Sequence, residues 1–151
     1  MTNFLSAELL PFALAACSGV LMAVQGSFNS VLSKSTGILE ATFIVHLVGA
    51  VGSFLLLFLF KIGQGNLAAW SFAPWYTWLG GLIGVGIVYL VASSIPSVGV
   101  ANATTAIIVG QVAAAVLIDH FGGFGLQRIP FSANQLIGVV LLAVGAKFLL
   151  K

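Results

Sequence analysis

Charged residues are scarce in this chain: five Lys or Arg and three Asp or Glu, or 5% of 151 residues. A water-soluble domain would carry about 25% charged residues. Hydrophobic residues make up 60% of the sequence, so the chain cannot cover its apolar surface against water. This composition argues against most soluble enzymes and indicates a protein whose solvent is lipid.

The sequence also contains only one cysteine and has a small net charge. The single cysteine, Cys17, lies inside an apolar run, which excludes a disulfide framework and a cysteine-bound metal. The formal net charge of +2 is too small to indicate nucleic-acid binding. Neither metal-ligand spacing nor a nucleophile–base pattern occurs in the sequence. We therefore expect no catalytic residues, no metal and no cofactor.

Five long apolar stretches fill most of the chain. A helix needs about 20 apolar residues to cross a hydrocarbon core of about 30 Å. The runs are continuous rather than alternating, which favours helices over membrane strands. The predicted spans are residues 8–32, 39–60, 75–95, 98–118 and 134–150. The sequence therefore predicts an all-α membrane protein with five transmembrane helices, in one domain over residues 1–151.

Turn-forming residues separate these spans. We expect a turn over residues 33–37, a loop at residues 63–66, and a tight turn at Pro96-Ser97 that makes the third and fourth spans an antiparallel hairpin. The longest polar break is expected between Gly122 and Pro130. Aromatic residues near the start of the third span are typical of a membrane interface; they are Trp70, Phe72, Trp75, Tyr76 and Trp78.

Charge gives almost no signal for orientation in the membrane. One side would hold Lys61 and Arg128, and the other Lys34, Lys147 and Lys151. The excess of Lys and Arg that normally fixes orientation is therefore nearly zero. Either a partner or a hydrophobicity gradient sets the orientation, or the chain inserts both ways. Two copies inserted oppositely would form the inverted repeats of a transporter, with the site near the midplane.

Amide side chains inside the predicted spans are the first candidates for a substrate pathway. Gln25 and Asn29 are four residues apart and share a helical face, and Gln111 lies deep in the fourth span. An amide in hydrocarbon needs a partner, either on a neighbouring helix or in a watered cavity. Hydrogen bonding between helices and contact with a solute both remain open for these residues.

Two further side chains are second-rank pathway candidates. His46 is the one ionisable residue clearly inside a span, and a histidine can exchange a proton near neutral pH. A neutral histidine bonded to a neighbouring helix is the favoured interpretation, because no acidic residue is near it in sequence. Tyr89 could offer its ring to a cationic or aromatic solute, or bond a neighbouring helix. Gly138 and Gly145, seven apart, form a smooth stripe suited to contact with a second copy.

Three stretches resemble the short, five-helix YdcZ-like family of the drug/metabolite transporter superfamily. They are GVLMAVQGSFN at residues 19–29, WLGGLIGVGIVYLVASSIPSVGVANATTAIIVGQ at residues 78–111, and LIDHFGGFG at residues 117–125 with the following Pro130 and Gly138. The resemblance implies a half-transporter of the inner membrane that pairs antiparallel and exports small solutes. By position, Gln25, Asn29 and Gln111 match the polar motif residues of that family, whereas His46 departs from it.

Together these observations predict a multi-pass inner-membrane exporter of a small organic solute, working by alternating access as an antiparallel dual-topology homodimer. Its partners would be the lipid bilayer, the solute, and a second copy or a homologous five-helix chain. Two alternatives remain: a dual-topology passive channel for a small ion, and a membrane subunit that does not transport. The substrate, the transport direction and the coupling ion are not specified by the sequence.

Overall fold

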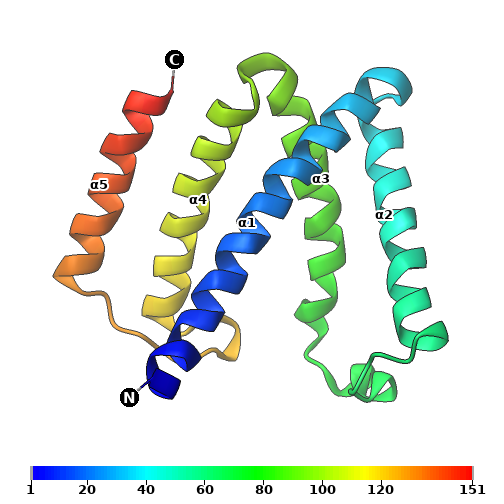
Figure 1. The fold of residues 1–151 in the computed structure, drawn as a ribbon, viewed down its shortest axis with the longest axis horizontal. Helices are drawn as coiled ribbons and strands as arrows, with labels where there is room; N and C mark the ends of the chain where they lie inside the picture. Colours follow the sequence, from blue (N-terminus) through cyan, green and yellow to red (C-terminus); the bar gives the residue numbers. More distant parts are fainter. Residues whose placement is uncertain (1, 151) are drawn as a thin grey trace. The chain divides into compact units, whose positions relative to one another are not determined.

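The computed structural model describes the backbone of residues 2–150 and the side chains of residues 9–150. This part of the chain is helical and contains no strand (Figure 1). The α-helices are α1 (Thr2–Thr36), α2 (Ile38–Phe54), α3 (Leu79–Val98), α4 (Val100–Phe121) and α5 (Ala133–Leu149). Shorter helical segments are η1 (Leu55–Leu59), η2 (Leu67–Phe72), η3 (Trp75–Trp78) and η4 (Gly123–Gly125). The prediction of an all-α protein is confirmed.

Four helical stretches are long and apolar enough to cross a membrane. They are Leu9–Thr36, Ile38–Leu59, Trp75–Val98 and Val100–Phe121. The fifth predicted span is present as α5, but this helix has only 17 residues. At 1.5 Å per residue it is about 26 Å long, the lower limit for crossing a bilayer.

Apolar side chains face outward over most of the described surface. The buried apolar residues among residues 9–150 are four alanines and Ile95. In contrast, Phe12, Leu21 and Leu90 are 75%, 68% and 67% exposed. Water would strongly disfavour so much exposed apolar area, whereas lipid solvates it. The exposure pattern therefore agrees with an integral membrane protein.

The chain forms two compact units, Met1–Pro96 and Ser97–Lys151, and each is described by itself. The single domain expected over residues 1–151 stays a prediction. In the first unit, α1 and α2 pack against each other and join at a sharp bend (Figure 1). The second unit contains α4 and α5, which also pack against each other.

The bend between α1 and α2 is a single residue, Gly37. Its φ of 101° is a left-handed conformation that suits glycine. The Ser33 and Thr36 hydroxyls donate to the Ser30 and Leu32 carbonyls at 2.9 and 3.0 Å, as hydroxyls within a helix commonly do. The prediction of a turn over residues 33–37 was therefore wrong for residues 33–36, which are helical.

Side chains of α3 reach α1 at Gly26. A Cβ atom added to Gly26 would lie 2.9 Å from Val91 Cγ1 and 3.2 Å from Ile95 Cδ1. Gly26 begins the buried stripe, which we define as Gly26, Asn29, Ser30 and Ser33 on α1. Asn29, Ser30 and Ser33 follow Gly26 by three, four and seven residues, so the four occupy one face of the helix. The small residue Gly26 on this stripe leaves room for the Val91 and Ile95 side chains of α3.

The break between α3 and α4 lies at Gly99 and not at Pro96-Ser97, where it was predicted. Helix α3 continues through Pro96 to Val98, and Gly99 takes a φ of 82° before α4 begins. Proline is tolerated within membrane helices, whereas a left-handed glycine makes a sharp stop. The antiparallel hairpin of these two spans stays a prediction.

The loop between α2 and α3 was predicted correctly, with residues 63–66 outside the α-helices. Before it, the backbone widens into the π-helical η1, where the Phe60 N–H donates to the Leu55 carbonyl at 2.9 Å. Beyond it, the Trp70 and Trp78 rings stack with centroids 4.5 Å apart. The predicted aromatic cluster is thus partly held together by ring contacts.

The loop between α4 and α5 is fastened to the end of α4. Gly122 ends the helix with a φ of 62°, as a left-handed glycine commonly does. The Phe131 N–H donates to His120 Nδ1 at 3.2 Å, and Arg128 Nε donates to the His120 carbonyl at 2.9 Å. The loop then enters α5 through a reciprocal cap between Ser132 and Gln135. The predicted long break at residues 122–130 is confirmed.

Candidate functional site

Asn29 is buried without a hydrogen-bonding partner. Its side chain is 4% exposed, and it forms no hydrogen bond to the described residues. Among these residues, no wholly inaccessible side-chain nitrogen or oxygen atom lacks a partner. The unpaired amide atoms of Asn29 therefore belong to the small part of this side chain that remains accessible. The Asn29 amide can donate two hydrogen bonds through its NH2 group and accept through its carbonyl oxygen, to water or another molecule that contacts it.

Gln25 and Gln111 are exposed, and neither forms a hydrogen bond within the described part of the chain. Gln25 precedes Gly26 and lies beside the buried stripe rather than in it. The expected common face therefore includes one exposed and one buried amide, Gln25 and Asn29. Gln111 belongs to α4 in the second unit and is described there alone. Within its own unit, neither glutamine side chain hydrogen-bonds to a described residue of another helix.

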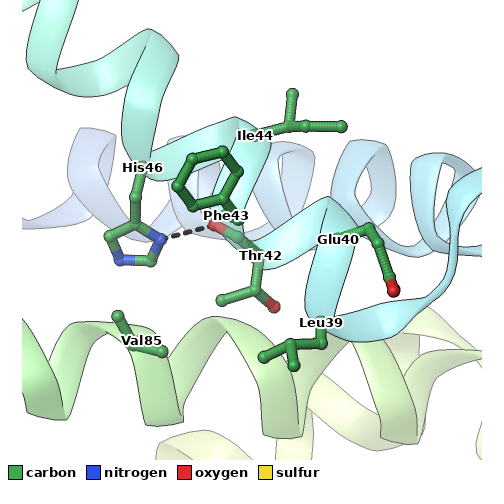
Figure 2. A pocket seen from close by; sticks show the side chains of 7 residues that line it. All are labelled: Leu39, Glu40, Thr42, Phe43, Ile44, His46 and Val85. Atoms are coloured by element: carbon green, nitrogen blue, oxygen red, sulfur yellow. Dashed lines mark hydrogen bonds between the residues drawn. The ribbon is translucent and has the colours of Figure 1, made fainter.

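His46 points from α2 toward α3. Its Nδ1 lies 2.8 Å from the Thr42 carbonyl oxygen (Figure 2). A carbonyl oxygen can only accept, so Nδ1 carries the hydrogen of this bond. In the neutral ring the lone pair then belongs to Nε2. A Cβ atom added to Gly84 of α3 would lie 3.5 Å from Nε2, so the glycine leaves open space beside this nitrogen.

His46 lines a pocket of about 590 Å³ at the surface of α2 and α3. The other lining residues are Leu39, Glu40, Thr42, Phe43, Ile44 and Val85. Small-molecule sites commonly have volumes of about 300–1,000 Å³ and mostly apolar linings. In Figure 2, His46 lies over Val85 at one end of the pocket and Glu40 lies at the other end. The pocket is therefore large enough for a small organic molecule.

Glu40 supports the start of α2. Its carboxylate lies so close to Gly37 that a Cβ atom at that glycine would collide with it. A carboxylate here faces the positive end of the helix dipole and the free N–H groups of the first turn. The negative charge at this end of the pocket is thus already matched by the helix.

Tyr89 and the two glycines predicted to contact a second copy, Gly138 and Gly145, are each open within their own unit. The Tyr89 side chain is 42% exposed, and its hydroxyl forms no hydrogen bond to the described residues. Cβ atoms added to Gly138 and Gly145 would meet no atom within 4 Å. These positions are open to lipid or to another chain.

Two glycines of this region were missed as individual residues by sequence reasoning. Gly26 sets the approach of α1 to α3, and Gly84 leaves the space beside His46 Nε2. In the sequence analysis both glycines appeared only within the stretches that resemble the family. No sequence signal identifies the side chain that a glycine faces, because that depends on the tertiary arrangement.

Comparison with known proteins gives one family and one curated relative. Residues 10–148 match the model of the family described as "Putative inner membrane exporter, YdcZ". The chain is 28% identical over 143 residues to "Inner membrane protein YdcZ" of Escherichia coli (strain K12), covering 92% of this chain and 93% of the relative. No solved structure matches.

Proposed function

This chain belongs to the YdcZ family of inner membrane exporters, and from this premise we propose that it exports a small organic solute by alternating access as an antiparallel homodimer. The family places the chain among multi-pass exporters of the inner membrane. The solute, the mechanism and the dimer are our proposal.

The observation that carries the proposal is the unpaired amide of Asn29. If this amide served to fasten α1 to a neighbouring helix of its own unit, it would hydrogen-bond to a described residue there, and it does not. Lipid tails cannot provide a hydrogen bond, and an unsatisfied polar group in hydrocarbon costs several kcal/mol. Water, a solute or a second copy of the chain must therefore provide the hydrogen bonds of the Asn29 amide. An aqueous pathway at the interface of two copies supplies all three.

The exposed amides support the same arrangement. Gln25 and Gln111 project from apolar helices and form no hydrogen bond to the described residues of their own units. Exposure to lipid would leave both amides unsatisfied, so we place them at the shared cavity of the dimer. An antiparallel pair of five-helix chains would have the inverted-repeat symmetry of known transporters, with this cavity near the membrane midplane.

Cysteine accessibility tests the pathway without knowledge of the solute. In a Cys17→Ser background, Asn29→Cys should react with a small, water-soluble, membrane-impermeant thiol reagent, and from either side of the membrane. Only a thiolate reacts, and it forms in contact with water and not in hydrocarbon. The matched control is Phe28→Cys, because Phe28 is 70% exposed on the same helix and should face lipid.

Asn29→Cys should therefore react many times faster than Phe28→Cys, although Asn29 is the more buried residue. Equal inertness of the two cysteines would remove Asn29 from any aqueous pathway. Labelling from one side only would contradict alternating access. A passive channel would instead give conductance that does not saturate, whereas the carrier should show saturable flux and counterflow.

A second prediction concerns pH. His46→Gln preserves hydrogen bonding but cannot titrate near neutral pH. Because His46 faces a pocket in a membrane helix, we expect this variant to remain folded and dimeric but to transport with a flattened pH profile between about pH 6 and 8. Transport measured across this pH range in vesicles checks the result. An unchanged profile would show that His46 does not exchange protons during transport.

A third prediction concerns the dimer contact on α5. Replacing Gly138 and Gly145 together with leucine should weaken dimers in mild detergent, because bulky side chains would force the two copies apart. The matched control is the double replacement of Gly19 and Gly49, which are equally open in the single chain. Size-exclusion chromatography with light scattering gives the dimer fraction. If both double variants dimerise like the parent, the interface lies elsewhere.

A further inference from the structure

The polar side chains of the His46 pocket have no hydrogen left to donate. The Thr42 hydroxyl donates to the Ile38 carbonyl at 2.8 Å, and His46 Nδ1 donates to the Thr42 carbonyl at 2.8 Å. An ionised Glu40 carboxylate has no hydrogen. The remaining lining residues, Leu39, Phe43, Ile44 and Val85, are apolar. No lysine or arginine lines the pocket.

The pocket does have an acceptor in the lone pair of His46 Nε2. The ring is half-buried, and its Nδ1 hydrogen is used in the bond to the Thr42 carbonyl, so the neutral ring presents its lone pair on Nε2. Nε2 lies beside Gly84, whose missing side chain leaves it room to accept a hydrogen bond. The helix N-terminus at the other end, which could attract an anion, already faces the Glu40 carboxylate.

We infer that this pocket binds small apolar solutes that carry an N–H or O–H donor, and that it rejects anions. The donor of the solute bonds His46 Nε2, and the apolar body lies against Phe43 and Val85. An anion would find no donor and would meet the Glu40 charge. This inference rests on the proposed export function and assigns a substrate class to it.

Direct binding separates the inference from the transport function. The probes are indole, which has one N–H donor; 1-methylindole, which has the same rings without the donor; and indole-3-carboxylate, which is an anion. Binding is followed by nitrogen NMR of the purified chain with labelled histidine, in detergent micelles. The signals that disappear in His46→Gln belong to His46, and those of His120 serve as an internal control.

Indole should shift the Nε2 signal of His46 saturably and leave His120 unaffected. Loss of one neutral hydrogen bond should weaken binding of 1-methylindole by about fivefold to tenfold. Indole-3-carboxylate should not shift the signal. His46→Gln, whose amide oxygen still accepts, should retain indole binding followed by titration calorimetry. His46→Leu should lose as much affinity as removal of the donor does.

Two outcomes would overturn the inference. One is equal binding of all three probes, which would show partition into apolar surface without recognition. The other is indole binding that His46→Leu leaves unchanged. If indole binds as expected but the parent chain transports no solute in vesicles, the ligand class stands and the export function fails. If the chain transports but His46 shows no response to any probe, the export function stands and the ligand class fails.

Discussion

Adding two or three lysines to the loop between α2 and α3 should push every copy into one orientation and remove most of the transport activity of the chain expressed alone. The native chain has a nearly balanced distribution of Lys and Arg, and a few added positive charges are enough to set orientation. Copies of one orientation cannot form an antiparallel pair. The shared cavity containing Gln25, Asn29 and Gln111 of both copies would then not assemble.

Activity should return when this variant is co-expressed with one that carries the added lysines on the opposite side. Each variant alone would then be the control for the other. Orientation is measured separately, by labelling a cysteine introduced at Gly65 in the Cys17→Ser background. Gly65 lies in the loop, and a Cβ atom there would meet nothing within 4 Å. In the native protein the loop should label from both sides. Labelling from one side only would contradict the dual-topology homodimer and would favour a separate partner chain of inverted orientation.

Gly26→Ala should destabilise the chain by about 1–3 kcal/mol, the usual cost of overpacking. The added Cβ would lie 2.9 Å from Val91 Cγ1, and a β-branched side chain has little freedom to move away. Alanine is favoured over glycine in helices by at most about 1 kcal/mol, so the steric term should win. The matched control is Gly19→Ala on the same helix, where the added Cβ meets nothing within 4 Å and only the favourable term remains.

The double variant Gly26→Ala with Val91→Ala should recover much of the stability, because it restores the space between α1 and α3. Unfolding in detergent by a chemical denaturant, followed by helical circular dichroism, gives the differences between the four chains. If Gly26→Ala and Gly19→Ala are equally stable, α1 does not approach α3 at Gly26 in the protein as it exists in the membrane.

The sequence was sufficient to locate the helices but not the residues at which they end. Long apolar runs require helices in lipid, and α5 begins and ends within one residue of the predicted span. The turns were less predictable, since several residue types are compatible with either state. Serine and threonine hydroxyls at residues 33–36 bond within α1 instead of opening a turn, and Pro96 continues α3 instead of ending it.

Only part of the candidate site could be predicted from the sequence. A polar side chain inside an apolar span is unfavourable in lipid and therefore rare. Asn29 and His46 could be chosen as candidates from their residue type and their position within predicted spans. The burial of Asn29 beside an exposed Gln25 could not be predicted, because the two differ by only a small rotation about α1. Which His46 nitrogen carries the lone pair, and whether there is space beside it, could not be predicted either. The first depends on the bond to the Thr42 carbonyl, and the second depends on Gly84 of α3.

The one-residue connection at Gly37 has a consequence for how the chain can change in length. Each residue of an α-helix turns the chain by about 100°. One residue inserted between Gly26 and Gly37 would rotate the Gly26 contact away from α3, and a single-residue bend cannot absorb that rotation. Residues 60–66 lie outside the α-helices, so an insertion there would not rotate one helix face relative to another. Relatives of this chain should therefore differ by insertions and deletions in that connection, while the spacing from Gly26 to Gly37 stays constant.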